Sequence, residues 1–372
     1  MTWRPARLGD VLTLKRGHDL PDSQRQDGDV PVVSSSGITG LHSEPRAKAP
    51  GVVTGRYGTI GEVFYIEEDY WPLNTALYVI DFKGNHPRFV AYFLESVLRN
   101  YQSDKSAVPG VNRNVLHEIN VRCPDTKIQE RIASVLSAYD NLIENNRRRM
   151  ALLEDAARQL YREWFVRLRF PGHEHTRITN GVPEGWERKT LGDLCDEIRE
   201  AVKPEALEPD TPYIGLEHMP RRSISLSEWG EAEQVTSSKH RFREGEILFG
   251  KIRPYFHKVG VAFVDGVASS DAIVIRPIEP KVRGFVLMTV SSDPFVAVTA
   301  QTMREGSKMP RADWKQMQAY PTPLPPDGLL RSFESAIQPV VDQLRSLTFA
   351  NHKLRTAREL LLPRLMSGEV EA

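Results

Sequence analysis

Two long stretches of the chain repeat apolar residues at alternating spacings of three and four, the heptad pattern of helices that pack against other helices. The members of the second pattern each lie 205 positions after their counterparts in the first, so the pattern predicts two matching long helices. The first predicted seam consists of Ile128, Ile132, Val135, Tyr139, Leu142, Asn146, Arg149, Leu153, Ala156 and Leu160. The second consists of Phe333, Ile337, Val340, Leu344, Leu347, Asn351, Leu354, Arg358, Leu361 and Leu365.

The length and narrowness of these patterns favour two helices that pack on each other. About 39 residues at 1.5 Å each would form a rod of roughly 58 Å. A helix that only covered its own domain would carry a broader apolar face, so we expect an antiparallel pair. Pro339 lies inside the second pattern and cannot donate to the preceding turn, which predicts a kink or a restart there.

Two asparagines occupy equivalent positions near the middle of the predicted helices, Asn146 in the first and Asn351 in the second. In an antiparallel pair they would lie opposite each other, and a buried asparagine pair can fix the register of two helices. The alternative, that one or both face solvent or a partner protein, stays open at this point.

An internal repeat organises the rest of the chain. Trp, Leu, Gly and Asp follow one another from Trp3 to Asp10 with the same spacing as from Trp186 to Asp193, an offset of 183. We therefore predict an α+β fold of two globular, mixed α/β domains joined by two long antiparallel helices that form a coiled coil, with pseudo-twofold symmetry. The predicted divisions are a first domain at 1–126, a first spacer helix at 127–168, a linker and second domain at 169–326, and a second spacer helix with a tail at 327–372.

Composition places the chain among ordinary globular proteins, with 40% hydrophobic and 26% charged residues. No apolar run approaches the roughly 20 residues of a membrane span, and the N-terminal residues do not form a secretory signal, so we expect a cytoplasmic protein. Cys123 and Cys195 lack the neighbours of a zinc site, which predicts two buried, unpaired thiols.

The charge balance is neutral, with 49 basic and 49 acidic residues, which by itself does not suggest a protein that binds nucleic acid. A surface for phosphate must therefore come from local placement. Between Arg221 and Lys258 eight basic residues face five acidic ones, which makes this segment a candidate.

The motifs of several enzyme classes are absent from the sequence. A methyltransferase would need a cofactor-binding glycine motif and an Asn/Asp-Pro-Pro-Tyr/Phe tetrapeptide, and neither occurs. Gly250 and Lys251 are followed by Ile252, without the hydroxyl residue of a phosphate-binding loop. His173 and His175 stand two apart in a linker without further ligands. We therefore expect neither catalytic residues nor a metal site.

Several segments together resemble the specificity subunit of type I restriction-modification systems: PEGWERKTLGDL, GEILFGKIRPYFHKVG, EGSKMPRADWKQM and ARELLLPRLMSGEV. The resemblance spans the chain and implies two target-recognition domains, each reading one half of a bipartite DNA target. It implies helices that set the unread gap, and a rod of roughly 58 Å suits half-sites about 34 Å apart. It also implies two methyltransferase subunits and two restriction/translocase subunits as partners. S-adenosylmethionine, ATP and Mg would be bound by those partners, and no cofactor by this chain.

The first half departs from these phrases, with GRYGTIG and SAVPGVNRNVL in the corresponding places, which fits domains that read different half-sites. Two other functions remain alternatives. One is a coiled-coil scaffold with two modules for ligands other than DNA, and the other is a stand-alone endonuclease.

Candidate DNA contacts are residues on predicted loops whose side chains can donate hydrogen bonds. Arginine can donate two hydrogen bonds to guanine, asparagine can pair with adenine, and any of these donors can bind a phosphate. In the first domain they are Ser34, Ser35, Ser36, Arg56, Tyr57, Lys105, Asn112 and Arg113. In the second they are Lys251, Arg253, Tyr255, His257, Lys258, Lys308 and Arg311. Apolar residues beside the seam that could dock the methyltransferase subunits are Leu152, Trp164, Phe165 and Leu362. For each candidate, the alternative is an ordinary surface or packing residue.

Overall fold

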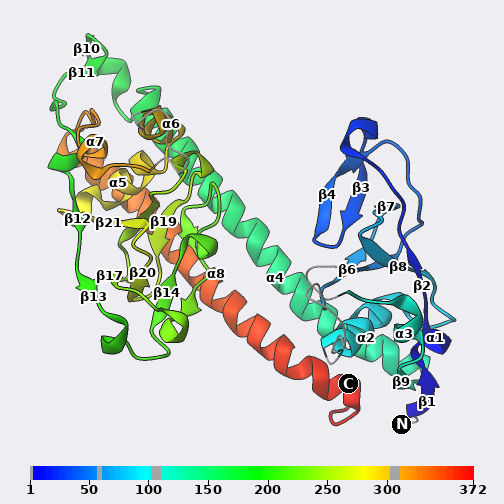
Figure 1. Cartoon of the computed structure of the whole chain (residues 1–372). Helices are drawn as coiled ribbons and strands as arrows, with labels where there is room; N and C mark the ends of the chain where they lie inside the picture. The colour runs from blue at the N-terminus through cyan, green and yellow to red at the C-terminus, as the bar shows by residue number, and fades with distance from the viewer. Residues whose placement is uncertain (1–2, 57–60, 100, 102–109, 302–310) are drawn as a thin grey trace. The chain divides into compact units, whose positions relative to one another are not determined.

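The computed structural model describes residues 3–56, 61–99, 101, 110–301 and 311–372, which form a mixed α/β chain with two long helices (Figure 1). The long helices are α4 (Thr126–Tyr161) and α8 (Asp327–Ser367). The chain divides into two compact units, one of residues Met1–Glu144 with His352–Ala372 and the other of residues Asn145–Asn351. Each long helix therefore begins in one unit and ends in the other.

The first unit is built on a four-stranded antiparallel sheet in the order β2-β8-β5-β6. Its strands are β2 (Thr13–Arg16), β8 (Ala76–Asp81), β5 (Gly51–Gly55) and β6 (Val63–Ile66). A three-stranded sheet contains β4 (Gly37–His42), β3 (Val30–Ser34) and β7 (Trp71–Pro72), and β1 (Trp3–Arg7) pairs with β9 (Asn120–Pro124). Three helices complete this unit: α1 (Leu8–Val11), α2 (Pro87–Arg99) and α3 (Arg113–His117).

The core of the first unit joins the sheet to both long helices. Helix α2 buries seven of its side chains, including Phe89 and Leu94. The same cluster contains Ile132 from α4 and Leu362 and Leu365 from α8. Leu362, a candidate for partner docking, is fully buried here, so that prediction is wrong. The end of α8 is thus part of the core of the N-terminal domain.

The second unit contains two five-stranded sheets. One has the order β12-β21-β18-β19-β15, with strands Cys195–Ile198, Ala272–Pro277, Ile247–Gly250, Val259–Ala262 and Ser225–Leu226. The other has the order β13-β17-β20-β14-β16, with strands Ala201–Val202, Lys239–Phe242, Gly266–Ala268, Pro212–Ile214 and Gly230–Glu231. The remaining elements are the hairpin β10 (Ile178–Thr179) with β11 (Val182–Pro183), and the helices α5 (Arg283–Val290), α6 (Asp293–Gln301) and α7 (Trp314–Met317).

The central strands of the two units follow the same antiparallel order. In the first unit β8 lies between β2 and β5, and in the second β21 lies between β12 and β18. In each case the next strand, β6 or β19, pairs with the strand that precedes it in the chain. The two cysteines, Cys123 and Cys195, are buried and unpaired as predicted.

Within the second unit, α4 and α8 pack in opposite directions. The amide nitrogen Nδ2 of Asn146 donates to Oδ1 of Asn351 at 2.9 Å, and the two residues are only 9% and 4% exposed. Further along α4, the ring of Tyr161 lies 6.4 Å from that of Phe333, which is earlier in α8. The alternative of solvent-facing asparagines is therefore wrong.

Within the first unit, an ion-pair network joins the same two helices. Arg358 of α8 contacts Asp140 of α4 at 2.9 Å and Glu95 of α2 at 2.7 Å, and its side chain is only 14% exposed. Breaking a buried pair by removing one partner leaves an uncompensated charge, which costs about 3–5 kcal/mol. This network therefore holds the end of α8 firmly against α2 and α4.

The predicted seam of α4 is partly wrong. Leu142 is 51% exposed, and Arg149 and Ala156 are exposed as well. The side chains one position later, Ile143, Met150 and Ala157, are buried instead. Both series keep a spacing of seven, so the helix has the predicted period, but half of its seam is displaced by one residue.

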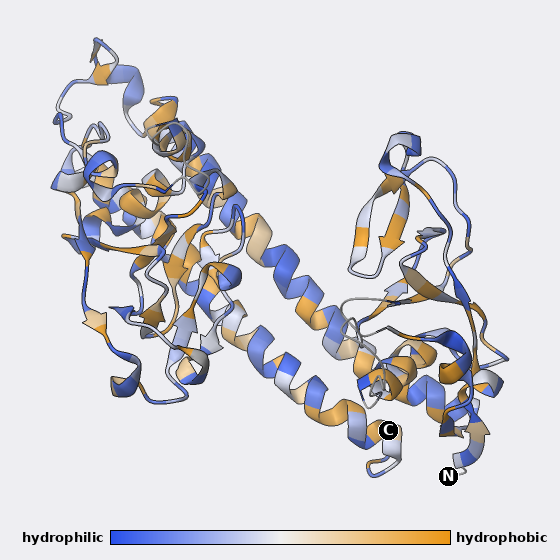
Figure 2. Ribbon diagram, viewed as in Figure 1, coloured by the Kyte–Doolittle hydropathy of each residue, from blue (hydrophilic) through white to orange (hydrophobic). Residues whose placement is uncertain are grey.

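The predicted restart at Pro339 does not occur, because α8 is a single helix from Asp327 to Ser367. A proline removes one backbone hydrogen bond and strains the preceding turn. Ile337 and Leu344 are buried on either side of it, and their packing holds the helix together. Figure 2 shows both long helices with alternating hydrophobic and hydrophilic bands. None of the helices in the described ranges has a stretch long and apolar enough to span a membrane.

We predict that Asn146 and Asn351 are energetically coupled. Replacing either with leucine leaves a buried amide unpaired and should destabilise the surrounding helical segments by about 1–3 kcal/mol. The double variant Asn146→Leu/Asn351→Leu should cost clearly less than the two single changes added together, because both polar groups are then gone. Hydrogen exchange of the α4 and α8 amides measures this, with the exposed Asn141→Leu as control. Additive effects would show that the pair is not a coupled unit.

Candidate nucleic-acid interface

A cationic pocket of about 440 Å³ lies at one end of the central strands in the first unit. Arg16 ends β2, Arg56 follows β5, and Asn112 and Arg113 stand at the start of α3. All four line the pocket, and no carboxylate is among its described lining residues. Three of these four residues were predicted as DNA contacts. The structure therefore brings together guanidinium and amide groups that are distant in sequence.

Backbone hydrogen bonds position these side chains. The carbonyl of Arg56 accepts from the amide of Val111 at 2.9 Å, which ties the end of β5 to the segment before α3. Oδ1 of Asn112 accepts from the amide of Asn114 at 2.9 Å and so caps α3. Arg16 donates from Nε to the carbonyl of Asn74 at 3.3 Å. The side-chain NH₂ group of Asn112 is not used by this cap.

The second unit repeats the same backbone arrangement. The carbonyl of Lys251, which follows β18, accepts from the amide of Ala312 at 2.8 Å. Oδ1 of Asp313 caps α7 by accepting from the amide of Lys315 at 3.0 Å. Lys251 thus corresponds to Arg56, and Asp313 to Asn112. Both domains join a basic residue after a buried strand to a capped helix.

The charges around this second arrangement are largely paired. Arg199 contacts Glu197 at 2.6 Å, and Arg311 contacts Asp271 at 3.3 Å. Lys251 donates from Nζ to the carbonyl of Ser270 at 3.2 Å, and burial lowers the pKa of its ammonium group. Carboxylates therefore offset part of the positive charge at this second site, whereas none is among the described lining residues of the pocket in the first unit.

The loop from Lys251 to Lys258 has both exposed and buried residues. Arg253 and Tyr255 are exposed, and the guanidinium of Arg253 lies 5.8 Å from the ring centre of Phe256. His257 is only 6% exposed, its Nε2 lies 2.7 Å from the carbonyl of Ser291, and burial lowers the pKa of its imidazole. This burial does not favour a DNA contact by His257.

Lys258 is half-buried. Its Nζ donates to the carbonyl of Leu216, and burial lowers the pKa of the ammonium group. With its ammonium directed to a carbonyl of its own unit, Lys258 is less available to a ligand than Arg253.

The three candidate serines form the turn between β3 and β4, away from the pocket lining. Ser34 is buried, donates to the carbonyl of Gly37 at 3.2 Å and accepts from the amide of Ser36 at 3.1 Å. Ser35 is half-buried and Ser36 is exposed. Ser34 therefore shapes the hairpin, and the exposed Ser36 has its hydroxyl 3.0 Å from that of Ser34. The remaining candidates, Tyr57, Lys105 and Lys308, lie outside the described residues.

Sequence reasoning missed Arg16 and Arg199. Arg199 follows Arg16 by 183 positions, the same offset that separates Trp3 from Trp186. This shared offset was a usable signal, because it places a basic residue at the end of an equivalent strand in both repeats. Arg221 belongs to the basic segment noted in the sequence but was not among the candidate contacts, and its guanidinium lies 4.1 Å from the ring centre of Phe256.

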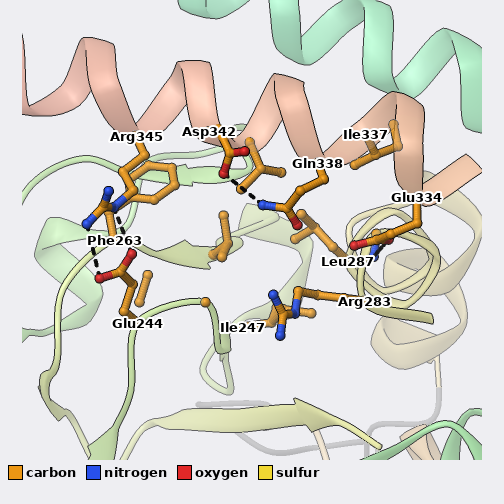
Figure 3. Close-up of a pocket in the computed structure, with 15 residues that line it drawn as sticks. Glu244, Ile247, Phe263, Arg283, Leu287, Glu334, Ile337, Gln338, Asp342 and Arg345 are labelled. Carbon is orange, nitrogen blue, oxygen red and sulfur yellow. Dashed lines mark hydrogen bonds and ion pairs between the residues drawn. The ribbon is translucent and has the colours of Figure 1, made fainter. Parts of the chain in front are cut away.

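A smaller pocket of about 170 Å³ lies between α8 and the second domain (Figure 3). Arg345 of α8 contacts Glu244 at 2.7 Å. Glu334 accepts from the amide of Gly284 at 2.7 Å, and burial raises the pKa of its carboxyl group. These groups satisfy one another, so this pocket belongs to the packing of α8. In the part of the chain that the structure describes, no three His, Cys, Asp or Glu side chains gather as metal ligands would.

The sequence is similar to those of known proteins. Residues 1–155 match the family described as type I restriction modification DNA specificity domain. The chain is 23% identical over 281 residues to the type I restriction enzyme MjaIX specificity subunit of Methanocaldococcus jannaschii, covering 72% of this chain and 64% of that protein. It is 21% identical over 353 residues to the EcoDI specificity subunit of Escherichia coli, covering 87% of this chain and 78% of that protein.

A solved structure shares the fold. The S subunit of a type I restriction-modification system from M. genitalium superposes with a TM-score of 0.61 at 14% sequence identity, over 98% of this chain and 96% of that one. The resemblance found in the sequence is thereby confirmed: the chain is similar to type I restriction-modification specificity subunits, and its first 155 residues match their DNA specificity domain.

Proposed function

We propose that this chain is the sequence-reading subunit of a type I restriction-modification enzyme, with each of its two domains reading one half of a bipartite DNA target. The main support is the arrangement that both domains share. Arg56 and Lys251 each follow a buried strand and are each tied by a backbone hydrogen bond to the segment before a capped helix. Such a frame holds forked and amide donors in place for base edges and phosphates.

The two long helices act in this proposal as an antiparallel coiled coil that sets the unread gap and relates the domains by a pseudo-twofold repeat. Three observations support it. Asn146 and Asn351 pair in one unit, Arg358 joins α8 to α4 in the other, and each helix begins in one unit and ends in the other. Two helices that bridge both units in opposite directions are suited to fix a distance.

The chain itself is non-catalytic in this proposal, and the chemistry resides on its partners. Two methyltransferase subunits would bind S-adenosylmethionine, and two restriction/translocase subunits would bind ATP and Mg. The near-neutral charge of the chain fits a reader whose affinity for DNA depends on partner surfaces. Leu152 on α4 is 70% exposed and remains a docking candidate, whereas Trp164 and Phe165 pack on the core of the second unit.

The alternative of a scaffold with two modules for other ligands finds no support among the relatives, all of which are specificity subunits. The alternative of a stand-alone endonuclease requires metal-dependent cleavage by the isolated chain. Our proposal requires that the isolated chain leave DNA intact.

The proposal makes a prediction about the form of the DNA target. Co-expression of this chain with its methyltransferase subunit should yield a stable complex, and sequencing of methylated bases in the host DNA should show one motif of two short halves separated by a fixed gap. Two recognition sites on one rigid spacer give that pattern because neither half is read alone. A host with the methyltransferase subunit alone is the control. A contiguous motif, or methylation without this chain, would contradict the proposal.

A further prediction concerns the arginines that line the pocket of the first unit. With the methyltransferase complex, Arg113→Gln should cost about 1–3 kcal/mol and relax specificity at one position of one half-site if Arg113 reads a base. If it contacts phosphate, binding should weaken on all sequences and the slope of log affinity against log salt should shrink by about one. Arg16→Gln is tested in the same way, and the exposed Arg4→Gln is the matched control. Binding like that of the control would remove the residue from the interface.

A further inference from the structure

A second basic pocket, of about 370 Å³, lies in the second unit where the end of α4 meets the start of α6. Its lining contains four arginines, Arg158, Arg162, Arg167 and Arg222, against a single carboxylate, Asp293. A pocket with so many guanidinium groups is suited to an anion, because each group offers forked donors to phosphate or carboxylate oxygens. None of these residues was among the predicted DNA contacts.

Ion pairs on the rim hold three of these arginines in place. Arg158 contacts Glu154 at 2.9 Å, and Arg167 contacts Glu163. Arg222 contacts Asp293 at 2.8 Å. These contacts reduce the net charge, but they also fix the guanidinium groups before any ligand binds.

Arg162 differs from its neighbours. It lies in the π-helical segment Arg162–Val166 that follows α4, and it is exposed. Among the residues that the structure describes, no carboxylate pairs with it. Arg162 therefore supplies the uncompensated positive charge of the pocket.

Part of the pocket lining is apolar, because Tyr161, Val166, Met288 and Pro294 also contribute to it. The hydroxyl of Tyr161 lies 3.1 Å from Oγ1 of Thr289 and so is already hydrogen-bonded within the protein. A fitting ligand therefore combines an anionic group with a less polar one. The phosphate and deoxyribose of a DNA strand have this combination.

The pocket adjoins the loop that we expect to face DNA. The amide of Arg222, which lines the pocket, donates to the carbonyl of His257 at the end of that loop, at 2.9 Å. The neighbouring Arg221 stacks on Phe256, and Arg253 lies near the same ring. Basic and aromatic groups thus continue from the loop to the rim of the pocket. This continuity favours DNA over an acidic protein segment as the ligand.

The sequence has no counterpart of this pocket at the other helix end. The positions 205 residues after Arg158, Arg162 and Arg167 are Pro363, Ser367 and Ala372, none of which is charged. An anion contact made by these arginines would therefore serve only the half-site read by the second domain.

We propose that this pocket binds a sugar-phosphate unit of the DNA backbone beside the second half-site, with Arg162 and Arg167 contacting the phosphate. The inference rests on the proposed function. It extends the footprint of the second domain from the recognised bases to the adjoining strand.

The test compares the double variant Arg162→Gln/Arg167→Gln with the matched control Arg147→Gln/Arg188→Gln, whose arginines are exposed in the same unit but do not line the pocket. Each chain is purified in complex with its methyltransferase subunit. Affinity is measured against salt concentration for a duplex with the mapped target and for a mixed-sequence duplex of equal length. The pocket variant should lose affinity for both duplexes, and its salt slope should shrink by about one to two relative to the control.

The outcomes separate this inference from the proposed function. If the unaltered complex prefers its target and the pocket variant keeps the same salt slope as the control, the pocket does not bind phosphate and the inference fails alone. If the pocket variant no longer assembles with the methyltransferase subunit while the control does, the arginines bind a protein and the inference is overturned. If the unaltered complex shows no preference for any target, the proposed function fails, and the inference fails with it.

Discussion

The register between α4 and α8 is the constraint on which the rest of the structure depends. In one unit it is held by the buried hydrogen bond between Asn146 and Asn351, and in the other by the contacts of Arg358 with Asp140 and Glu95. A slip of one heptad would leave the asparagine amides unpaired and the buried guanidinium without its carboxylates at the same time. Because the helices end in the cores of both units, such a slip would also expose their apolar side chains.

The two domains share the backbone hydrogen bond that joins Arg56 or Lys251 to the segment before a capped helix, but they differ in the charges around it. The pocket of the first domain has Arg16 and Arg113 without a described carboxylate in its lining, whereas Arg199 and Arg311 of the second are paired with Glu197 and Asp271. An arginine in an ion pair keeps a defined side-chain orientation, but it attracts phosphate less strongly because the carboxylate offsets its charge. If the proposed phosphate pocket at the end of α4 binds DNA, it compensates for this weaker attraction on the side of the second domain.

The sequence predicted the two long helices and their period, because both depend on spacing along the chain. It did not predict the phase of the α4 seam. Ile143 and Met150 are buried where Leu142 and Arg149 were expected, and adjacent apolar residues cannot be separated without knowing which surface each helix meets. The restart expected at Pro339 was wrong for a similar reason, since packing on both sides of it outweighs the loss of one hydrogen bond.

The sequence indicated Arg56, Asn112 and Arg113 of the candidate site but did not show which other candidates are buried. The structure pairs Arg56 with Lys251, and the offset of 183 between Trp3 and Trp186 also relates Arg16 to Arg199. The sequence does not show which polar side chains of a loop are buried. His257 and Ser34 were therefore predicted as DNA contacts, although their side chains form hydrogen bonds within the protein. The arginine pocket of the second unit was harder still to predict, because its lining comes from four separate segments of the chain. Only the fold shows that the end of α4, Arg222 and the end of the loop from Lys251 to Lys258 meet around one basic pocket, which is what the proposed phosphate contact requires.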